Sequence, residues 1–385
     1  MYISKNPLCL FFFLLITSIT SAQESATSSK KIHYAPEGEN FILKNGSRKF
    51  NRALYGTNTG FRVETGDLPE FAMYMPKMGG NFKLGIATKS TSKWITVCDS
   101  ITTRYNPGTM LYEIRDALLQ KGLIKIQVVA HAKNDAMILK VETENIPKNL
   151  ELIWLYGGAS GKRFHREGDI GADPESVFYL TPEYCTNNQY AIKKNGFLLN
   201  YGSENNKEKT GNNRTIVGNF PKSDIKLIEA HLQKSPIELL HSEAKTTPAI
   251  SGKIALNRQD TFIWKLENND TFISTNQKQL ETEFKEGLQK VKILAARVKL
   301  KTPDTYINTL GAALAIAGDA IWENPAYLHG SVAWRMHLNA WRGAYVADPL
   351  GWHDRAETHF KAYSNSQVLE PESGPVVLDS SRNFA

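Results

Sequence analysis

The apolar residues of this 385-residue chain change their spacing once, and that change constrains the fold more than any other feature. From residue 31 to residue 270 they fall in short runs bounded by Gly, Asn, Pro and charged residues. Such runs are typical of β-strands. The sequence therefore predicts a large β-sandwich over residues 31–270, and we expect it to close its own core. The clearest strands are Phe61–Val63, Lys93–Val97, Ile124–Val128, Ala136–Val141, Leu152–Tyr156 and Thr261–Leu266.

Several pairs of runs are joined by residues that favour tight turns. Asn45-Gly46 and Asn195-Gly196 supply the positive φ angles that a two-residue hairpin turn requires. Lys121-Gly122 stands in a similar place between two apolar runs. We expect a hairpin at each of these three positions.

After residue 270 the spacing becomes helical. Apolar residues recur every three or four positions from Gln277 to Val298, which predicts an amphipathic linker helix within residues 275–299. Thr302-Pro303-Asp304 then indicates a new helix start, with Thr as the cap and Pro in the first turn. One side of this second helix carries Tyr306, Ile307, Leu310, Leu314, Ala317 and Ile321, and its Ala and Gly content predicts close packing against neighbouring helices.

The N-terminus has the pattern of an export signal. Lys5 precedes an apolar run from Leu8 to Ile19, and the small residues Thr20-Ser21-Ala22 follow it. We expect a signal peptide over residues 1–22, with cleavage after Ala22 and export to the periplasm or the medium. Cys9 lies inside the apolar run, so we expect no lipid anchor. No other segment approaches the roughly 20 apolar residues of a spanning helix, so we expect no membrane partner after cleavage.

The charge pattern argues against nucleic acid as a partner. The net charge is +7, but the basic residues are scattered among acids rather than gathered on one stripe. Cys98 and Cys185 remain after cleavage, and the sequence leaves open whether they are joined or are free core residues. His353 and His359 are six residues apart without a His-x-x-x-His or Cys pair, so we expect no metal and no other cofactor.

Aromatic and charged residues gather between positions 322 and 359. Four of the seven tryptophans and four of the nine histidines lie there: Trp322, Trp334, Trp341, Trp352, His329, His337, His353 and His359. They alternate with Arg335, Arg342, Arg355, Asp348 and Asp354. Sugars stack their CH-rich faces on indole rings and pair their hydroxyls with Arg, His and Asp. The segment is therefore a candidate sugar site, although the same residues also suit a core with buried ion pairs.

Five segments resemble a known family. They are Gly56-Thr57-Asn58, Phe61–Phe71, Met78–Asn81, Trp341–Tyr345 and Leu350–Arg355. Together they resemble exported bacterial proteins with a domain called DUF4450, whose members are similar to six-hairpin glycosidases. Thr302-Pro303-Asp304 with Asn308 also resembles the barrel entry of other such sugar enzymes. The resemblance implies a β-sandwich, a linker helix and, over residues 302–385, the first helices of an incomplete (α/α)6 toroid.

The same resemblance implies a carbohydrate-active protein, the N-terminal part of a glycoside hydrolase that acts on a complex polysaccharide or its oligosaccharides. Its substrate contacts would be Trp341, Arg342, Tyr345, Trp352, His353 and Arg355. A catalytic acid and base would then fall beyond Ala385, unless Asp348 and Asp354 are themselves a retaining pair, about 5 to 5.5 Å apart. A polysaccharide lyase and a non-catalytic glycan-binding protein are the alternatives.

Overall fold

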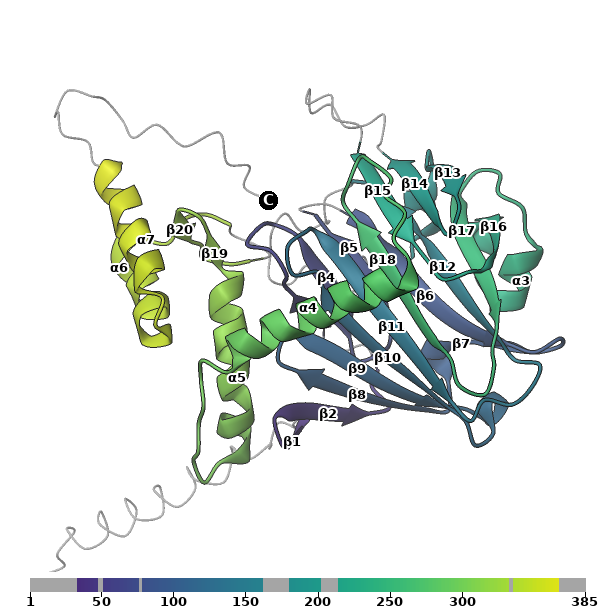
Figure 1. The fold of residues 1–385 in the computed structure, drawn as a ribbon, viewed down its shortest axis with the longest axis horizontal. Coiled ribbons are helices and arrows are strands. Elements are labelled where there is room, and N and C mark those ends of the chain that lie inside the picture. Colours follow the sequence, from purple (N-terminus) through teal and green to yellow (C-terminus); the bar gives the residue numbers. More distant parts are fainter. Residues whose placement is uncertain are drawn as a thin grey trace, which may run out of the picture. The chain divides into compact units, whose positions relative to one another are not determined.

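Antiparallel strands make up most of the second of two units into which the chain divides, residues 1–35 and residues 36–385. The computed structural model describes residues 33–47, 51–75, 78–161, 180–201, 214–331 and 335–366 (Figure 1). The expected signal peptide and Trp334 lie outside these ranges. Among the helices within them, none is long and apolar enough to cross a membrane.

The larger of two sheets, here called sheet A, has ten strands within the described residues, in the order β1-β2-β8-β9-β10-β11-β18-β15-β14-β13. Along the chain these strands are β1 (Ala35–Glu37), β2 (Asn40–Lys44), β8 (Ser100–Asn106), β9 (Thr109–Arg115), β10 (Leu123–Ala130), β11 (Ala136–Glu144), β13 (Gln189–Lys193), β14 (Gly196–Tyr201), β15 (Arg214–Asn219) and β18 (Thr261–Glu267). The last strand of the sheet in sequence, β18, pairs with β11 on one side and with β15 on the other.

Sheet B has eight strands in the described part of the chain, in the order β16-β17-β12-β6-β5-β4-β3, with β7 paired to β6. They are β3 (Asn51–Leu54), β4 (Arg62–Gly66), β5 (Phe71–Tyr74), β6 (Met78–Ala87), β7 (Ser92–Trp94), β12 (Glu151–Ala159), β16 (Asp224–Glu229) and β17 (Pro248–Ala255). The expected β-sandwich is therefore present.

Aromatic side chains fill the space between the two sheets. Phe71 of sheet B meets Tyr112 of sheet A edge to face, with ring centroids 5.8 Å apart. Phe82 of sheet B packs against Trp264 of sheet A with tilted rings whose centroids are 5.7 Å apart. The Tyr112 hydroxyl donates to the Gly66 carbonyl oxygen at 2.8 Å, so its one polar atom is satisfied and burial raises its pKa. Large aromatic side chains of both sheets therefore contribute to the core between them.

One of the three expected hairpins is wrong. Asn45 does have a positive φ of 50°, but the strands on either side of it, β2 and β3, belong to different sheets. The hairpin near Lys121-Gly122 is present, because β9 and β10 pair antiparallel. Its connection is not a two-residue turn, since it contains a 3-10 helix, η2 (Ala117–Leu119), capped by Asp116. The third hairpin is present, but its register makes Lys194-Asn195 the turn, since Lys193 pairs with Gly196.

The remaining elements are helices and two short strands outside the two sheets. They are η1 (Ile95–Val97), where the end of an expected strand coils instead, and η3 (Pro182–Cys185), η4 (Ala230–Leu232), α3 (Pro236–His241), α4 (Gln277–Ala295), α5 (Thr305–Ala320), β19 (Trp322–Glu323), β20 (Ala326–Tyr327), α6 (Ala340–Ala347), η5 (Asp348–Leu350) and α7 (His353–Asn365). Cys98 and Cys185 are buried free thiols, and burial raises the pKa of each to about 12.

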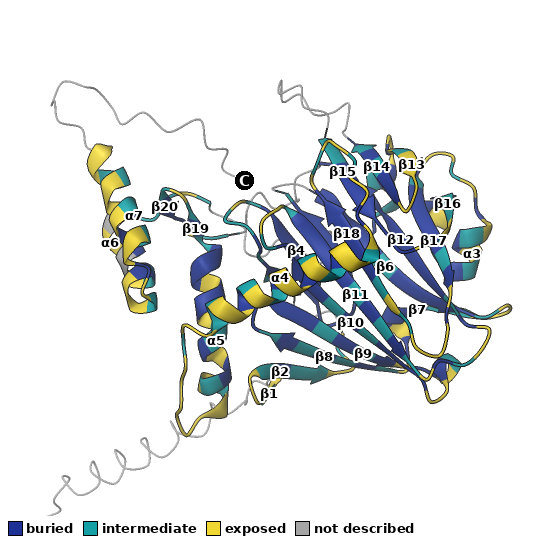
Figure 2. Ribbon diagram, in the orientation of Figure 1, coloured by how far each residue is buried: buried dark blue, intermediate teal, exposed yellow. Residues whose placement is uncertain are grey.

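Helix α4, the expected linker helix, ends three residues earlier than the periodicity predicts. It begins with a capping box between Asn276 and Gln279, and its buried residues Leu280, Phe284 and Val291 pack on Val129, Ile138 and Ile263 of sheet A. Figure 1 shows α4 running across β18, β11 and β10, and Figure 2 shows exposed residues alternating with buried ones along it. Helix α4 thus buries part of the outer face of sheet A, while the core between the two sheets lies on the other face of that sheet. That residues 31–270 close their own core without α4 stays a prediction.

Helix α5 begins two positions later than its capping signal suggests. Asp304 is the N-cap, and its carboxylate accepts from the backbone N–H groups of Tyr306 and Ile307 at 2.8 and 3.3 Å. Pro303 therefore lies outside the helix. Thr302 supports the cap from outside, because its hydroxyl accepts from the Asp304 N–H at 3.1 Å.

Candidate functional site

The aromatic residues of the C-terminal segment divide into a buried group and an exposed group. Trp322, Tyr327, Ala347, Trp352 and Ala356 form one apolar cluster between the β19–β20 hairpin and helices α6 and α7. Gly343 makes the approach of α6 to α7 possible, since a Cβ atom there would lie 2.3 Å from the His359 ring. His359 is itself buried, and its Nδ1 accepts from the Tyr327 N–H at 3.2 Å.

Trp352 is part of this buried group, with 5% of its surface exposed. Two guanidinium groups lie against its ring, Arg297 at 4.9 Å and Arg355 at 4.5 Å from the ring centroid. Arg355 also donates to the Asp319 carboxylate at 2.8 Å. Trp352 and Arg355 therefore pack inside the helical segment and stabilise it. This arrangement corresponds to the core with buried ion pairs that the sequence left open beside a sugar site.

Three other expected contact residues lie on the surface of α6. Trp341 and Tyr345 are 53% and 72% exposed, and they stand one helical turn apart. Their rings meet edge to face with centroids 5.6 Å apart, and the Arg342 guanidinium lies 4.9 Å from the Trp341 ring centroid. Two large rings and a forked donor therefore face solvent together, which is the arrangement a sugar ring can use.

The two carboxylates considered as catalytic groups are both exposed. Asp348, in η5, pairs with His353 at 2.9 Å between Oδ1 and Nδ1. Asp354 lies in the first turn of α7, where a carboxylate is favoured by the helix dipole. Sequence reasoning placed His353 against substrate, whereas the structure gives it a neighbouring acid as partner.

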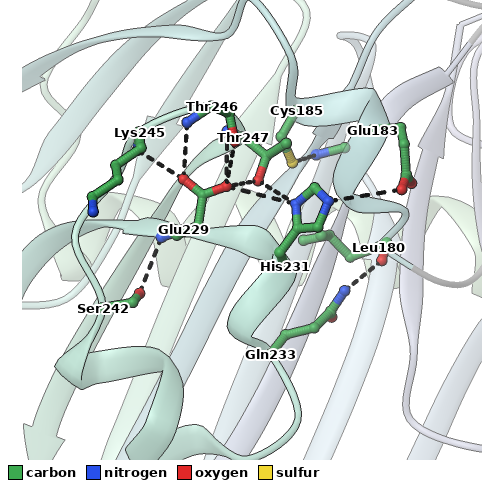
Figure 3. Close-up of polar contacts among 11 residues, drawn as sticks. Leu180, Glu183, Cys185, Glu229, His231, Gln233, Ser242, Lys245, Thr246 and Thr247 are labelled. Atoms are coloured by element: carbon green, nitrogen blue, oxygen red, sulfur yellow. Dashed lines mark hydrogen bonds and ion pairs between the residues drawn. The ribbon is translucent and has the colours of Figure 1, made fainter.

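A second polar cluster lies at the edge of sheet B, and sequence reasoning did not identify it. Figure 3 shows the Glu229 carboxylate surrounded by donors of the loop that follows α3. It accepts from the N–H groups of Lys245, Thr246 and Thr247 at 2.7, 3.0 and 3.0 Å, and from both threonine hydroxyls. Burial raises the pKa of Glu229, but these hydrogen bonds outweigh it and bring the pKa to about 2.

His231 completes this cluster. Its Nδ1 lies 2.9 Å from the Thr247 hydroxyl, and its Nε2 lies 3.9 Å from a Glu183 oxygen (Figure 3). A carboxylate with a pKa of about 2 and five donors is a poor proton acceptor at neutral pH, so the cluster fixes a loop rather than activating a nucleophile. The described residues contain no group of three or more His, Cys, Asp or Glu that could hold a metal ion.

The Gly56-Thr57-Asn58 motif lies where the sandwich meets the helical segment. The Asn58 amide donates to the Asp319 carbonyl oxygen at 3.0 Å, and Lys290 donates to the carbonyl oxygens of Gly56 and Ala132. A Cβ atom at Gly56 would lie 2.0 Å from the His131 carbonyl oxygen, so no other residue fits there. The motif therefore joins two parts of the fold.

Arg62 and Arg335 add buried polar contacts near this junction between the sandwich and the helical segment. Arg62 pairs with Glu64 on β4, and its guanidinium lies 3.5 Å from the centroid of the Tyr74 ring. The Tyr55 hydroxyl bonds the Ser331 hydroxyl at 2.7 Å, and Arg335 donates to the Ser331 carbonyl oxygen at 2.9 Å. The loop before α6 is thus tied to the start of sheet B.

The profile of the family described as "Domain of unknown function (DUF4450)" matches residues 75–287, which is more than half of the chain. The chain belongs to the DUF4450 family. The match runs from the end of β5 into α4, so the α6 surface of this DUF4450 protein lies C-terminal to it.

The solved structures include a bacterial glucoamylase complexed with acarbose, to which this DUF4450 protein is similar. The two are 10% identical, with a TM-score of 0.49, over 84% of this chain and 53% of the glucoamylase. The DUF4450 chain thus spans about half the length of that enzyme. None of the curated proteins matches it.

Proposed function

We propose that this protein binds a poly- or oligosaccharide on the exposed surface of α6 formed by Trp341, Arg342 and Tyr345. The observation that carries the proposal is the pair of exposed rings, because large aromatic side chains held in water favour a ligand that covers them. The Arg342 guanidinium beside them supplies donors for sugar hydroxyls or a uronate carboxylate.

Truncating one ring tests this binding surface. We expect Trp341→Ala and Tyr345→Ala each to weaken glycan binding about tenfold, as loss of a central aromatic anchor does. The measurement is titration calorimetry with whichever pectic, hemicellulosic or host-type glycan binds the wild type. Phe360→Ala on α7 is the matched control, since it also removes an exposed ring. Equal affinities in all four proteins would refute the α6 surface.

The finer proposal is that this protein is the N-terminal part of a glycoside hydrolase. Its support is the sandwich-then-helices order and the two exposed carboxylates Asp348 and Asp354 next to the ring surface in sequence. Turnover of a glycan that Asp348→Asn or Asp354→Asn abolishes would assign the acid and base to this segment. Glycan binding without turnover would favour a binding role for these residues.

We also propose that the protein is exported, on the strength of the basic, apolar and small-residue order of residues 1–22. N-terminal sequencing of protein from the periplasm or medium should give Gln23 as the first residue. Mature protein that begins at Met1 in the cytoplasm would contradict export.

A further inference from the structure

The two largely buried arginines of the C-terminal segment each pair with an acid of this chain. Arg355 donates to the Asp319 carboxylate at 2.8 Å, and Arg335 pairs with Glu323. Arg342 differs from both, because it is exposed and, within the described residues, has no carboxylate at ion-pair distance. It is also the single charged residue of α6. The fold therefore neutralises the neighbouring arginines and leaves the Arg342 charge to water or to a ligand.

The surroundings of Arg342 distinguish it from an ordinary exposed arginine. Its guanidinium lies 4.9 Å from the centroid of the Trp341 ring, and the Tyr345 ring meets Trp341 edge to face at 5.6 Å. The N–H groups of a guanidinium point outward in its own plane, so contact with one ring leaves donors for a second group. A ligand that covers the rings thus meets a positive charge with a forked set of donors.

No acid on the same helix competes for this charge. Residues 338–346, one helical turn on either side of Arg342, include no Asp or Glu. The next acid along the chain, Asp348, is already paired with His353 at 2.9 Å. An anionic group that approaches Arg342 is therefore not repelled by a carboxylate of α6. The charge of the surface complements a negatively charged ligand.

We infer that the α6 surface selects a uronate, a sugar with a carboxylate on its ring, over the corresponding neutral sugar. The CH face of the sugar covers the exposed rings, and its carboxylate accepts from two N–H groups of Arg342, the bidentate geometry that a planar guanidinium favours. A neutral sugar makes the ring contact without the ion pair. Arg342 is thus the residue that sets specificity, and this inference rests on the glycan-binding surface proposed above.

Two oligosaccharides of one length, oligogalacturonate and its methyl ester, test this selectivity, because esterification removes the charge and keeps the sugar rings. Titration calorimetry with the full chain should show about fivefold tighter binding of the acid, the upper end of what an exposed ion pair contributes. The preference should shrink as the NaCl concentration rises, because salt screens exposed charges.

Substitutions at Arg342 assign the preference to its side chain. Arg342→Gln should bind the acid and the ester with equal affinity, because glutamine has no charge to pair with the carboxylate. Arg342→Lys should keep part of the preference, since lysine retains the charge but not the fork. Arg115→Gln on β9 is the matched control, because it also removes an exposed arginine that makes no ion pair among the described residues. That control should prefer the acid as the wild type does.

Equal binding of the acid and the ester by the wild type, or a preference that survives in Arg342→Gln, would overturn the inference. Absence of binding to both would overturn it as well and would leave the α6 surface to a neutral glycan. Trp341→Ala separates this result from failure of the proposed function. If selectivity alone fails, that variant still binds the wild type's glycan more weakly, whereas if the surface itself is wrong, it binds as tightly as the wild type.

Discussion

Replacing Trp352 with alanine is expected to lower the free energy of unfolding by about 3–5 kcal/mol, the cost of removing a buried tryptophan. The ring is 5% exposed and packs with Trp322, Tyr327, Ala347 and Ala356. Its loss leaves a cavity in the cluster and removes the aromatic face against which Arg297 and Arg355 lie. Urea unfolding, followed by circular dichroism, gives the difference.

Trp341→Ala is the control for this experiment, because it removes the same side chain from an exposed position on α6. We expect that substitution to change the free energy of unfolding by less than about 0.5 kcal/mol. Trp352→Ala should therefore lower the free energy of unfolding, whereas Trp341→Ala should weaken glycan binding and leave the free energy of unfolding nearly unchanged. Equal effects of the two substitutions would contradict the division of the C-terminal segment into a buried and an exposed group.

Glu229→Gln is expected to lower the free energy of unfolding at pH 7 by about 2–3 kcal/mol. The carboxylate is 8% exposed and accepts from three backbone N–H groups and two hydroxyls of the loop that leads into β17. An amide at this position turns one acceptor into a donor that faces other donors. Chemical denaturation at pH 7 measures the loss, and Glu238→Gln, an exposed acid on α3, is the matched control.

The Glu229 contribution should also depend on pH in a defined window. Its pKa is lowered from 4.5 to about 2 in the folded protein, so its stabilisation is fully present above pH 4.5. It is lost as the pH falls toward 2, and about 2 kcal/mol of it should be gone by pH 3. The gap in stability between wild type and Glu229→Gln should therefore narrow between pH 5 and pH 3. A gap that stays constant would show that Glu229 is not held ionised by these bonds.

The strands and α4 could be predicted because their signals are local. The apolar runs Ala136–Val141 and Thr261–Leu266 can be recognised without knowledge of the rest of the fold. The hairpin prediction at Asn45 failed because strand pairing, and not the turn, decides which strands are neighbours. Asn45 has the expected positive φ angle, yet the strand before it, β2, pairs with β8, which lies far along the chain. Whether two adjacent strands share a sheet depends on long-range contacts that turn residues do not record.

The candidate site was predicted as a set of residues but not as an arrangement. Composition placed Trp341 and Trp352 together, while the register of α6 and α7 puts one in water and the other in the core. Glu229 gave no signal at all, because its partners are 16 to 18 residues away in a loop. Side-chain roles of this kind follow from tertiary packing.

The strand order of sheet A also determines when the sandwich can fold. β18 joins the group that ends at β11 to the group that begins at β15, so neither group is complete until Thr261–Glu267 has been synthesised. Until then β11 and β15 each present a free edge to other chains. Because β18 pairs with strands far from it in sequence, its late synthesis delays closure of sheet A until the last strand of the sandwich has been made.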